Sequence, residues 1–187
     1  MAHKALPCPT VLRQLLRYDP ETGKLFWRER DPKWFASTGR QTKEHRAANW
    51  NSRYANKEAF TATALGYRVG RIFDRMHRAH RVIWAMEIGS WPVGEIDHIN
   101  GQRDDNRLSN LRDVSSSING RNKCLRSDNT SGHQGIYWSA AAGKWVSCAW
   151  VDGTYHYFGL HADLSDAVAA RKVADPLLGF HENHGRK

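Results

Sequence analysis

The sequence predicts an α+β protein: a strand–loop–strand–helix unit, followed by a three-stranded antiparallel sheet packed on one helix. Residues 94–122 are rich in Asn, Asp, Arg and His and poor in large apolar side chains. Residues 135–158 instead alternate between aromatic and polar side chains, with turn residues between the alternating stretches. A helical pattern with one face of small side chains follows over 164–173.

The first sixty residues are predicted to hold one helix, one strand and a polar arm. Residues 10–17 have apolar side chains at helical spacing, and Thr10 can cap that helix. Residues 18–23 (YDPETG) have turn chemistry, and 24–28 (KLFWR) predict a short strand. Residues 29–58 are polar, basic and aperiodic, so we expect a long loop or a flexible arm there.

The middle of the chain predicts a hairpin over 66–81 and a helix over 80–88. The strand–loop–strand–helix unit comes next. Residues 96–99 form its first strand and 110–114 its return strand, and Ser115 caps a short helix.

This pattern divides the chain into five parts. They are an N-terminal part with a helix, hairpin and basic loop (1–60), the strand–loop–strand–helix region (61–123), a linker (124–131), the aromatic sheet module (132–178) and a tail expected to be solvated (179–187).

Composition favours a nucleic-acid partner. The 28 Lys and Arg residues outnumber the 19 Asp and Glu residues, and the formal charge of +9 attracts polyanions. No apolar run is long enough to cross a membrane and no signal-peptide core is seen, so we expect a cytoplasmic protein with no membrane partner. Cys8, Cys124 and Cys148 are far apart, which argues against a disulfide framework or a cysteine zinc site.

The candidate chemistry centres on the pair Asp97–His98. A metal held between a strand end and the helix needs hard oxygen ligands, which Asp97 and Asn119 supply. A neutral His98 beside that metal can take a proton from water for attack on phosphorus, and Asn110 can fix the imidazole tautomer. In the alternative reading, Asn100 begins an Asn-Gly turn and Asp97 only caps it.

Residues 97–122, DHINGQRDDNRLSNLRDVSSSINGRN, resemble HNH endonucleases of the phage and intron-encoded type. The family pattern is D-H-[IV]-[ND]-G, a loop ending N-R, then L-x-N-L-R and a helix with Asn. The resemblance implies that His98 is the general base, that Asp97 and Asn119 are metal ligands, and that Asn110 orients His98. Asn119 stands where many relatives have His, which implies one Mg²⁺ or Mn²⁺ ion rather than zinc.

Several neighbouring residues keep two readings. Arg107 and Arg112 either reach DNA phosphates or pair with nearby acids, namely Asp104, Asp105 or Asp113. Asn106 is expected to tie down the loop, and Asn122 to be an exposed residue at the helix end. His80 is either a second catalytic imidazole or, as we prefer, a buried residue that ties the 80–88 helix to the HNH unit.

Residues 131–175 are similar to the Apetala-type DNA-binding domain, through the motifs GIY, GKW, YFG and AVAARKVA in that order. The resemblance implies a sheet that lies in the DNA major groove. In the alternative reading, the exposed rings only pack across strands. The residues expected to contact DNA are Tyr137, Trp150, Tyr155 and Tyr157 on the sheet face, and Lys144, Arg171 and Lys172 at phosphates.

Together these features predict a metal-dependent endonuclease, of a nicking or homing-like type, that hydrolyses phosphodiester bonds in duplex DNA inside the bacterial host of a phage or mobile element. One site per chain favours a monomer that nicks one strand. The alternative is a non-catalytic DNA-binding regulator with a vestigial HNH unit. RNA is disfavoured as a substrate because the A-form major groove excludes protein elements.

Overall fold

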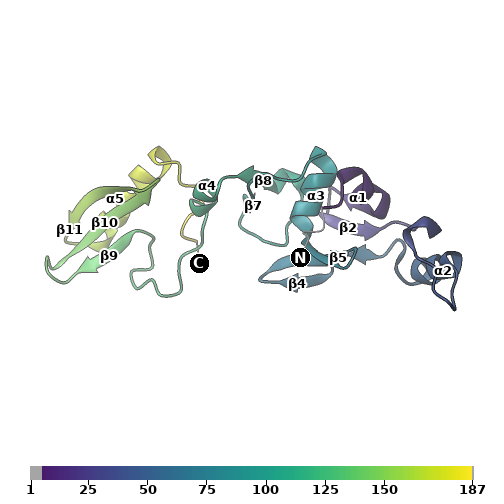
Figure 1. The fold of residues 1–187 in the computed structure, drawn as a ribbon. Helices are drawn as coiled ribbons and strands as arrows, with labels where there is room; N and C mark the ends of the chain where they lie inside the picture. Colours follow the sequence, from purple (N-terminus) through teal and green to yellow (C-terminus); the bar gives the residue numbers. More distant parts are fainter. Residues whose placement is uncertain (1–5, 187) are drawn as a thin grey trace. The chain divides into compact units, whose positions relative to one another are not determined.

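The computed structural model describes residues 6–186, and they form two compact units. The first unit is the chain up to His98 together with Gln102–Arg112, and the second is Ile99–Gly101 together with the chain from Asp113 onward. Figure 1 shows the fold coloured along the chain, from purple at the N-terminus to yellow at the C-terminus. The boundary between the units therefore falls inside the 97–122 motif.

The first unit contains two three-stranded antiparallel sheets, with strand orders β1-β2-β3 and β4-β5-β6. Its helix α1 precedes the first sheet, and α3 follows the second sheet and ends at Gly89, whose φ is +86°. The expected hairpin and the expected second helix are both present. The bounds are α1 (Pro9–Leu15), β1 (Leu16–Asp19), β2 (Lys24–Trp27), β3 (Glu58–Ala59), β4 (Ala62–Ala64), β5 (Tyr67–Ile72), β6 (Arg75–Arg78) and α3 (Ala79–Ile88).

The expectation of a loop or flexible arm over 29–58 is wrong. This segment holds the short 3-10 helix η1 (Pro32–Trp34) and the helix α2 (Lys43–Tyr54). The Thr42 side chain accepts a hydrogen bond from the backbone N–H of His45 and so caps α2. The helix buries only Ala47 and most of its residues are polar, so its few apolar positions do not stand out in the sequence.

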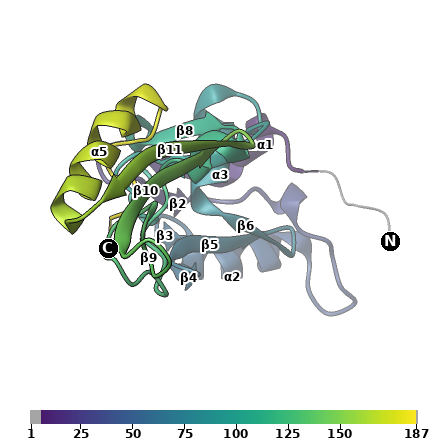
Figure 2. The same cartoon turned by 90° about the vertical axis from the view of Figure 1, so that its left-hand side faces the viewer.

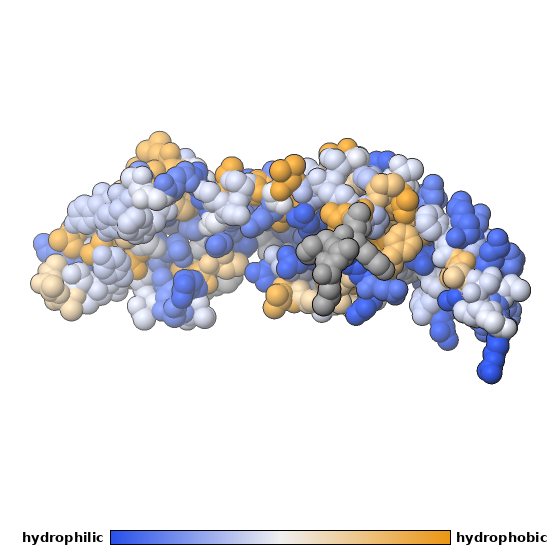
Figure 3. Space-filling view, viewed as in Figure 1, coloured by the Kyte–Doolittle hydropathy of each residue, from blue (hydrophilic) through white to orange (hydrophobic). Residues whose placement is uncertain are grey.

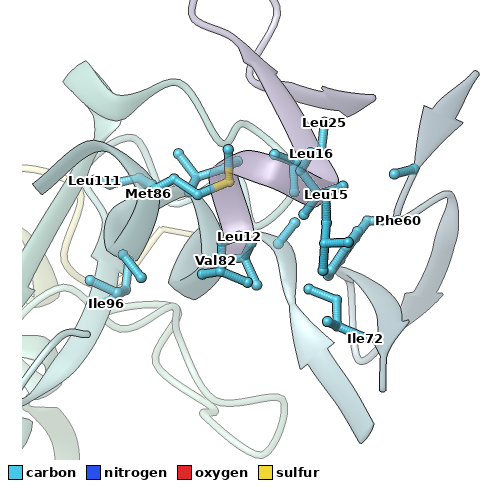
Figure 4. Close-up of a cluster of buried hydrophobic side chains, with 14 residues drawn as sticks. Leu12, Leu15, Leu16, Leu25, Phe60, Ile72, Val82, Met86, Ile96 and Leu111 are labelled. Atoms are coloured by element: carbon cyan, nitrogen blue, oxygen red, sulfur yellow. The ribbon is translucent and has the colours of Figure 1, made fainter. Parts of the chain in front are cut away.

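The core of the first unit combines side chains from the N-terminal helix with side chains from the strands β7 (Glu95–His98) and β8 (Leu111–Val114). Leu12, Leu15 and Leu16 are fully buried, and Leu12 of α1 lies against α3 beside Val82 (Figure 4). Each such side chain contributes about 1.5–3 kcal/mol by leaving water. Ile96 and Leu111 belong to the same cluster (Figure 4). The strand that carries Asp97 and His98 is therefore anchored in the N-terminal core.

The second unit is a three-stranded antiparallel sheet, in the order β11-β10-β9, with the helix α5 on it. Figure 2 shows α5 alongside β10 and β11. Ile136, Ser147, Ala149 and Ala167 are buried between the sheet and the helix, and a β-bulge follows Ser147. The α+β fold class is confirmed. The bounds are β9 (Ile136–Ser139), β10 (Lys144–Val151), β11 (Thr154–His161) and α5 (Leu164–Leu177).

The expectation of a solvated C-terminal tail is wrong. It runs beside residues 121–125 and exchanges backbone hydrogen bonds with them: His181 N to Arg121 O (3.1 Å), Gly185 N to Lys123 O (2.8 Å) and Leu125 N to Arg186 O (2.7 Å). Arg186 Nη1 also donates to the backbone and side-chain oxygens of Asn122, at 2.8 and 3.0 Å. Asn122, expected to be exposed, is buried.

Candidate active site

The strands β7 (Glu95–His98) and β8 (Leu111–Val114) form a two-stranded sheet, joined by a loop that ends in the short 3-10 helix η2 (Leu108–Asn110). Asp97 and His98 lie at the end of β7 and are only 6% and 4% exposed. A buried carboxylate and a buried imidazole need polar partners, because desolvation without them is costly. The partners of this pair define the site.

The partner of His98 is Asn106. His98 Nε2 lies 3.1 Å from Asn106 Oδ1, and Asn106 Nδ2 donates to the Asp104 carbonyl (3.3 Å), which fixes the orientation of the amide. Because a carboxamide oxygen can only accept a hydrogen bond, Nε2 carries the proton. In the neutral ring, Nδ1 then carries the lone pair and is the basic atom.

Burial keeps the His98 ring neutral. It lowers the pKa of His98, and this effect exceeds the opposing effects of the Asn106 hydrogen bond and of Asp97 and other nearby acids. A general base must be unprotonated before it reacts. The environment of His98 therefore provides the protonation state that this role requires.

Two further rings surround His98. The ring centroids of His80 and His98 are 5.0 Å apart in an edge-to-face arrangement, and Tyr67 lies 5.0 Å from His80 and 5.9 Å from His98. His80 is buried, its Nδ1 has no hydrogen-bond partner, and burial lowers its pKa to about 3. This environment agrees with the preferred reading of His80 as a buried residue that ties α3 to the HNH unit.

Asp97 is paired with Arg112. Arg112 donates to Asp97 Oδ2 from Nε (2.8 Å) and from Nη2 (2.7 Å). The guanidinium therefore balances the buried carboxylate. Arg107 is paired with Asp105 through Nε (2.8 Å) and Nη2 (2.6 Å). Both arginines thus form the ion pairs that were one of their two readings, although Asp97 was not among the acids expected for Arg112.

Asn110 holds the loop on which Asn106 lies. It is buried, and its Nδ2 donates to the Asp105 carbonyl (2.8 Å). Asn106, the residue that the sequence assigned only to the loop, makes a direct contact with His98.

Strand β1 and the turn after it also contact this loop. The Tyr18 hydroxyl accepts from Leu108 N (2.8 Å) and donates to the Asn106 carbonyl (3.3 Å). Gly23, with φ +70°, is packed so tightly that a Cβ there would lie 2.7 Å from the Asn106 carbonyl carbon. Sequence reasoning treated YDPETG as a turn and missed this function. The signal available was its Gly at the end of the turn.

Asn119 lies in the second unit, on α4 (Ser116–Gly120). The Ser115 side chain caps α4 by accepting from Ile118 N. Ser117 and Arg121 bind Asp152, which lies between β10 and β11, and so tie α4 to the C-terminal sheet. The structure thus brings Asp97, His98 and Asn110 together in the first unit and places Asn119 on a helix held by the second.

The rings predicted to contact DNA lie on the β9–β11 sheet and are exposed. Trp150 and Tyr155 have ring centroids 5.2 Å apart, and hydrogen bonds with Cys148 and Tyr137 raise the pKa of Tyr155. The exposed residues of this set are Tyr137, Trp150, Tyr155, Tyr157, Lys144 and Lys172.

Arg171 differs from the rest of that set. It is only 5% exposed, and its guanidinium donates to the Cys148 carbonyl and to the Asp175 carboxylate. A phosphate contact would require Arg171 to leave both partners. We therefore do not include it in a DNA-binding surface.

No cluster of three or more His, Cys, Asp or Glu side chains that could hold a metal ion is found among residues 6–186. The predicted ligand set has a different composition, since Asp97 is its one carboxylate and Asn119 supplies a carboxamide. No helix in the described part of the chain is long and apolar enough to span a membrane.

Comparisons with known proteins place the chain in a family. The family model described as HNH endonuclease matches residues 77–121, which include Asp97, His98, Asn110 and Asn119. Protein 3.8 of Escherichia phage T7 is 34% identical over 98 residues, which cover 52% of this chain and 80% of that protein. No solved structure matches the chain. The chain therefore belongs to the family of phage Protein 3.8 and carries an HNH endonuclease domain at residues 77–121.

Proposed function

We propose that this protein is a metal-dependent endonuclease that nicks duplex DNA, with His98 as its general base. The observation that carries the proposal is the hydrogen bond between His98 Nε2 and Asn106 Oδ1, 3.1 Å long and buried. It leaves the basic Nδ1 of a neutral ring to take a proton from water. A DNA-binding regulator has no need of a buried, tautomer-fixed imidazole beside a buried carboxylate.

The side chains at the site suit a hard divalent cation. HNH nucleases generally use a divalent metal ion. Asp97 offers a carboxylate whose charge is balanced by Arg112, and the motif assigns Asn119 as a second oxygen ligand. Carboxylate and carboxamide oxygens favour Mg²⁺ or Mn²⁺ over zinc. Such an ion, when bound, would stabilise the charge that develops on the phosphate oxygens.

The chain's own residues would do the rest. His98 Nδ1 accepts the proton of the attacking water, and Asn106 keeps the ring in the required tautomer. Arg78 and Arg103 are exposed and lie over the Tyr67 ring, at 4.7 and 5.2 Å from its centroid. They add positive charge next to His98, where a DNA phosphate must approach.

For the second unit we propose an Apetala-type DNA-binding role. The support is its three-stranded sheet with α5 on it, together with exposed rings and exposed Lys144 and Lys172. Lysines at phosphates set affinity without sequence selectivity. A single HNH site per chain suits a monomer that nicks one strand, in a homing-like role within the bacterial host of a phage.

Relaxation of supercoiled plasmid with Mg²⁺ tests the nuclease. We expect the native chain to produce open-circular DNA and His98→Ala to lose this activity by at least about a hundredfold, with the circular-dichroism spectrum and duplex binding retained. Equal relaxation by the two proteins would refute the mechanism. No Mg²⁺-dependent relaxation by the native chain, with duplex binding intact, would instead support the regulator.

A further inference from the structure

A groove of about 560 Å³ in the first unit is built almost entirely from aromatic and arginine side chains. Six of its ten lining residues are aromatic and three are arginines, with one aspartate. They come from β2 and the segment after it, from η1 and the residue after it, from α2, and from the end of β5 and the turn that follows. None of these residues belongs to the HNH motif or to the aromatic sheet face.

The aromatic side chains form pairs along the groove. Trp50 and Tyr54 of α2 have ring centroids 5.3 Å apart, and Trp34 and Phe73 have centroids 5.8 Å apart. Trp34 packs against the core, but Tyr54 is 40% and Phe73 45% exposed. Trp34 is thus partly buried against the core, whereas Phe73 and Tyr54 leave flat apolar surface open to a ligand in the groove.

The three arginines outnumber the single aspartate of the lining, so the groove carries excess positive charge. Arg30 lies 3.9 Å from the Trp50 ring centroid, and its buried Nε has no hydrogen-bond partner. Arg46 and Arg71 donate to the backbone carbonyls of Ala36 and Asp74. Within residues 6–186, none of the three arginines forms an ion pair. A guanidinium with a buried, unpaired donor favours an anionic ligand.

We propose that this groove binds unpaired nucleotides of a DNA strand, whose bases stack on Tyr54 and Phe73 and whose phosphates contact Arg46 and Arg71. Only a ligand with both flat π-faces and regular negative charge satisfies both halves of the lining. Bases in an intact duplex are stacked on each other and cannot reach these rings. The choice of DNA rests on the proposed nuclease function, whereas the ring and charge chemistry does not.

The surface around α2 agrees with such a ligand. Figure 3 shows mainly hydrophilic residues over the part of the first unit that holds α2 in Figure 1. Basic side chains of α2 include Lys43, Arg46 and Arg53. A negatively charged strand that enters the groove therefore meets further positive charge at its margin.

Fluorescence anisotropy with a labelled oligothymidine of about 12 nucleotides and with a labelled hairpin duplex tests the proposal. The full chain is used in EDTA, where the probes stay intact. Tyr54→Leu and Phe73→Leu keep apolar bulk but remove the ring. We expect each to weaken oligothymidine binding about five- to a hundredfold and duplex binding less than about twofold, with unchanged thermal melting.

Salt dependence tests the charge half of the proposal. Arg71→Gln should reduce the slope of log K against log salt for oligothymidine by about 0.7, the value for one phosphate contact on a single strand. Arg40→Gln is the matched control, because Arg40 is exposed and does not line the groove. It should leave the slope unchanged.

Three results would overturn the proposal. The first is native affinity for oligothymidine in both ring variants. The second is an equal loss on oligothymidine and duplex. The third is that the ring variants lose binding to labelled polyglutamate but keep native binding to oligothymidine, which would assign the groove to acidic peptides. None of these measurements requires cleavage, so a chain that fails to nick plasmid can still bind through the groove, and one that nicks can fail to do so.

Discussion

Replacing Arg186 by Ala tests whether the C-terminal tail stabilises the segment around Asn122. Arg186 Nη1 donates to Asn122 O (2.8 Å), Asn122 Oδ1 (3.0 Å) and Asn183 O (3.0 Å). A hydrogen bond from a charged donor contributes about 1.5–3 kcal/mol net. Because one nitrogen makes all three contacts, we count them once. Arg186→Ala should therefore lower the free energy of unfolding by about 1.5–3 kcal/mol, measured by urea denaturation.

Arg126→Ala is the matched control in the same unit. Arg126 pairs with Asp128 through two hydrogen bonds, but both side chains are exposed. Exposed pairs are screened by water and salt, so the control should denature at the same urea concentration as the native chain. If Arg186→Ala behaves like this control, the reasoning fails, because the tail contacts then contribute nothing in solution.

Gly101 provides an independent check of the same contact. It has φ +74°, and a Cβ there would overlap the Arg186 guanidinium. Gly101→Ala in the native chain should therefore cost the backbone penalty of about 1–2 kcal/mol together with displacement of Arg186. In the Arg186→Ala background only the backbone penalty remains. Equal costs in the two backgrounds would show that Arg186 does not lie over Gly101.

Three further predictions concern the site. Tyr18→Phe removes both hydrogen bonds to the loop that carries Asn106, so it should reduce plasmid nicking while duplex binding is unchanged. Asn106→Ala should reduce nicking by about a hundredfold, measured at saturating Mg²⁺, because the His98 tautomer is no longer fixed. Burial lowers the pKa of His80 to about 3 in the folded chain. As the pH falls, the His80 side chain is therefore protonated in the unfolded state before it is protonated in the folded state. Stability should fall from pH 6.5 toward pH 3 with a slope of up to about 1.4 kcal/mol per pH unit, and His80→Phe should flatten this slope in urea titrations at several pH values.

The fold class was predictable because its signals are local. Alternating aromatic and polar residues gave the β9–β11 sheet, and small residues at helical spacing gave α5. The helix α2 was missed because its few apolar residues stand among many polar ones. The Thr42 cap and the aromatic contacts of Trp50 stabilise it. Periodicity most readily detects helices that bury a whole face, whereas α2 buries only Ala47.

The sequence motif singles out a set of candidate residues, but the pairings of these residues could not be predicted from it. The motif located Asp97, His98 and Asn110, since their order and spacing are part of its pattern. The contact of His98 with Asn106 depends on how the loop between β7 and β8 turns back, which no spacing specifies. The tail was missed for another reason. Its anchoring uses backbone hydrogen bonds at His181, Gly185 and Arg186, and such bonds are not restricted to particular side chains.

The division of the HNH motif between two units explains why this chain needs long segments on both sides of it. The motif has few large apolar side chains, and Ile96 and Leu111 gain their burial in the N-terminal core. The helix α4 has five residues and buries none of them, too short to be stable alone. Asp152 and the tail hold it in the second unit. Each half of the motif thus depends on a different core, so the first ninety residues and the C-terminal sheet are structural requirements of the site in addition to any contact they make with DNA.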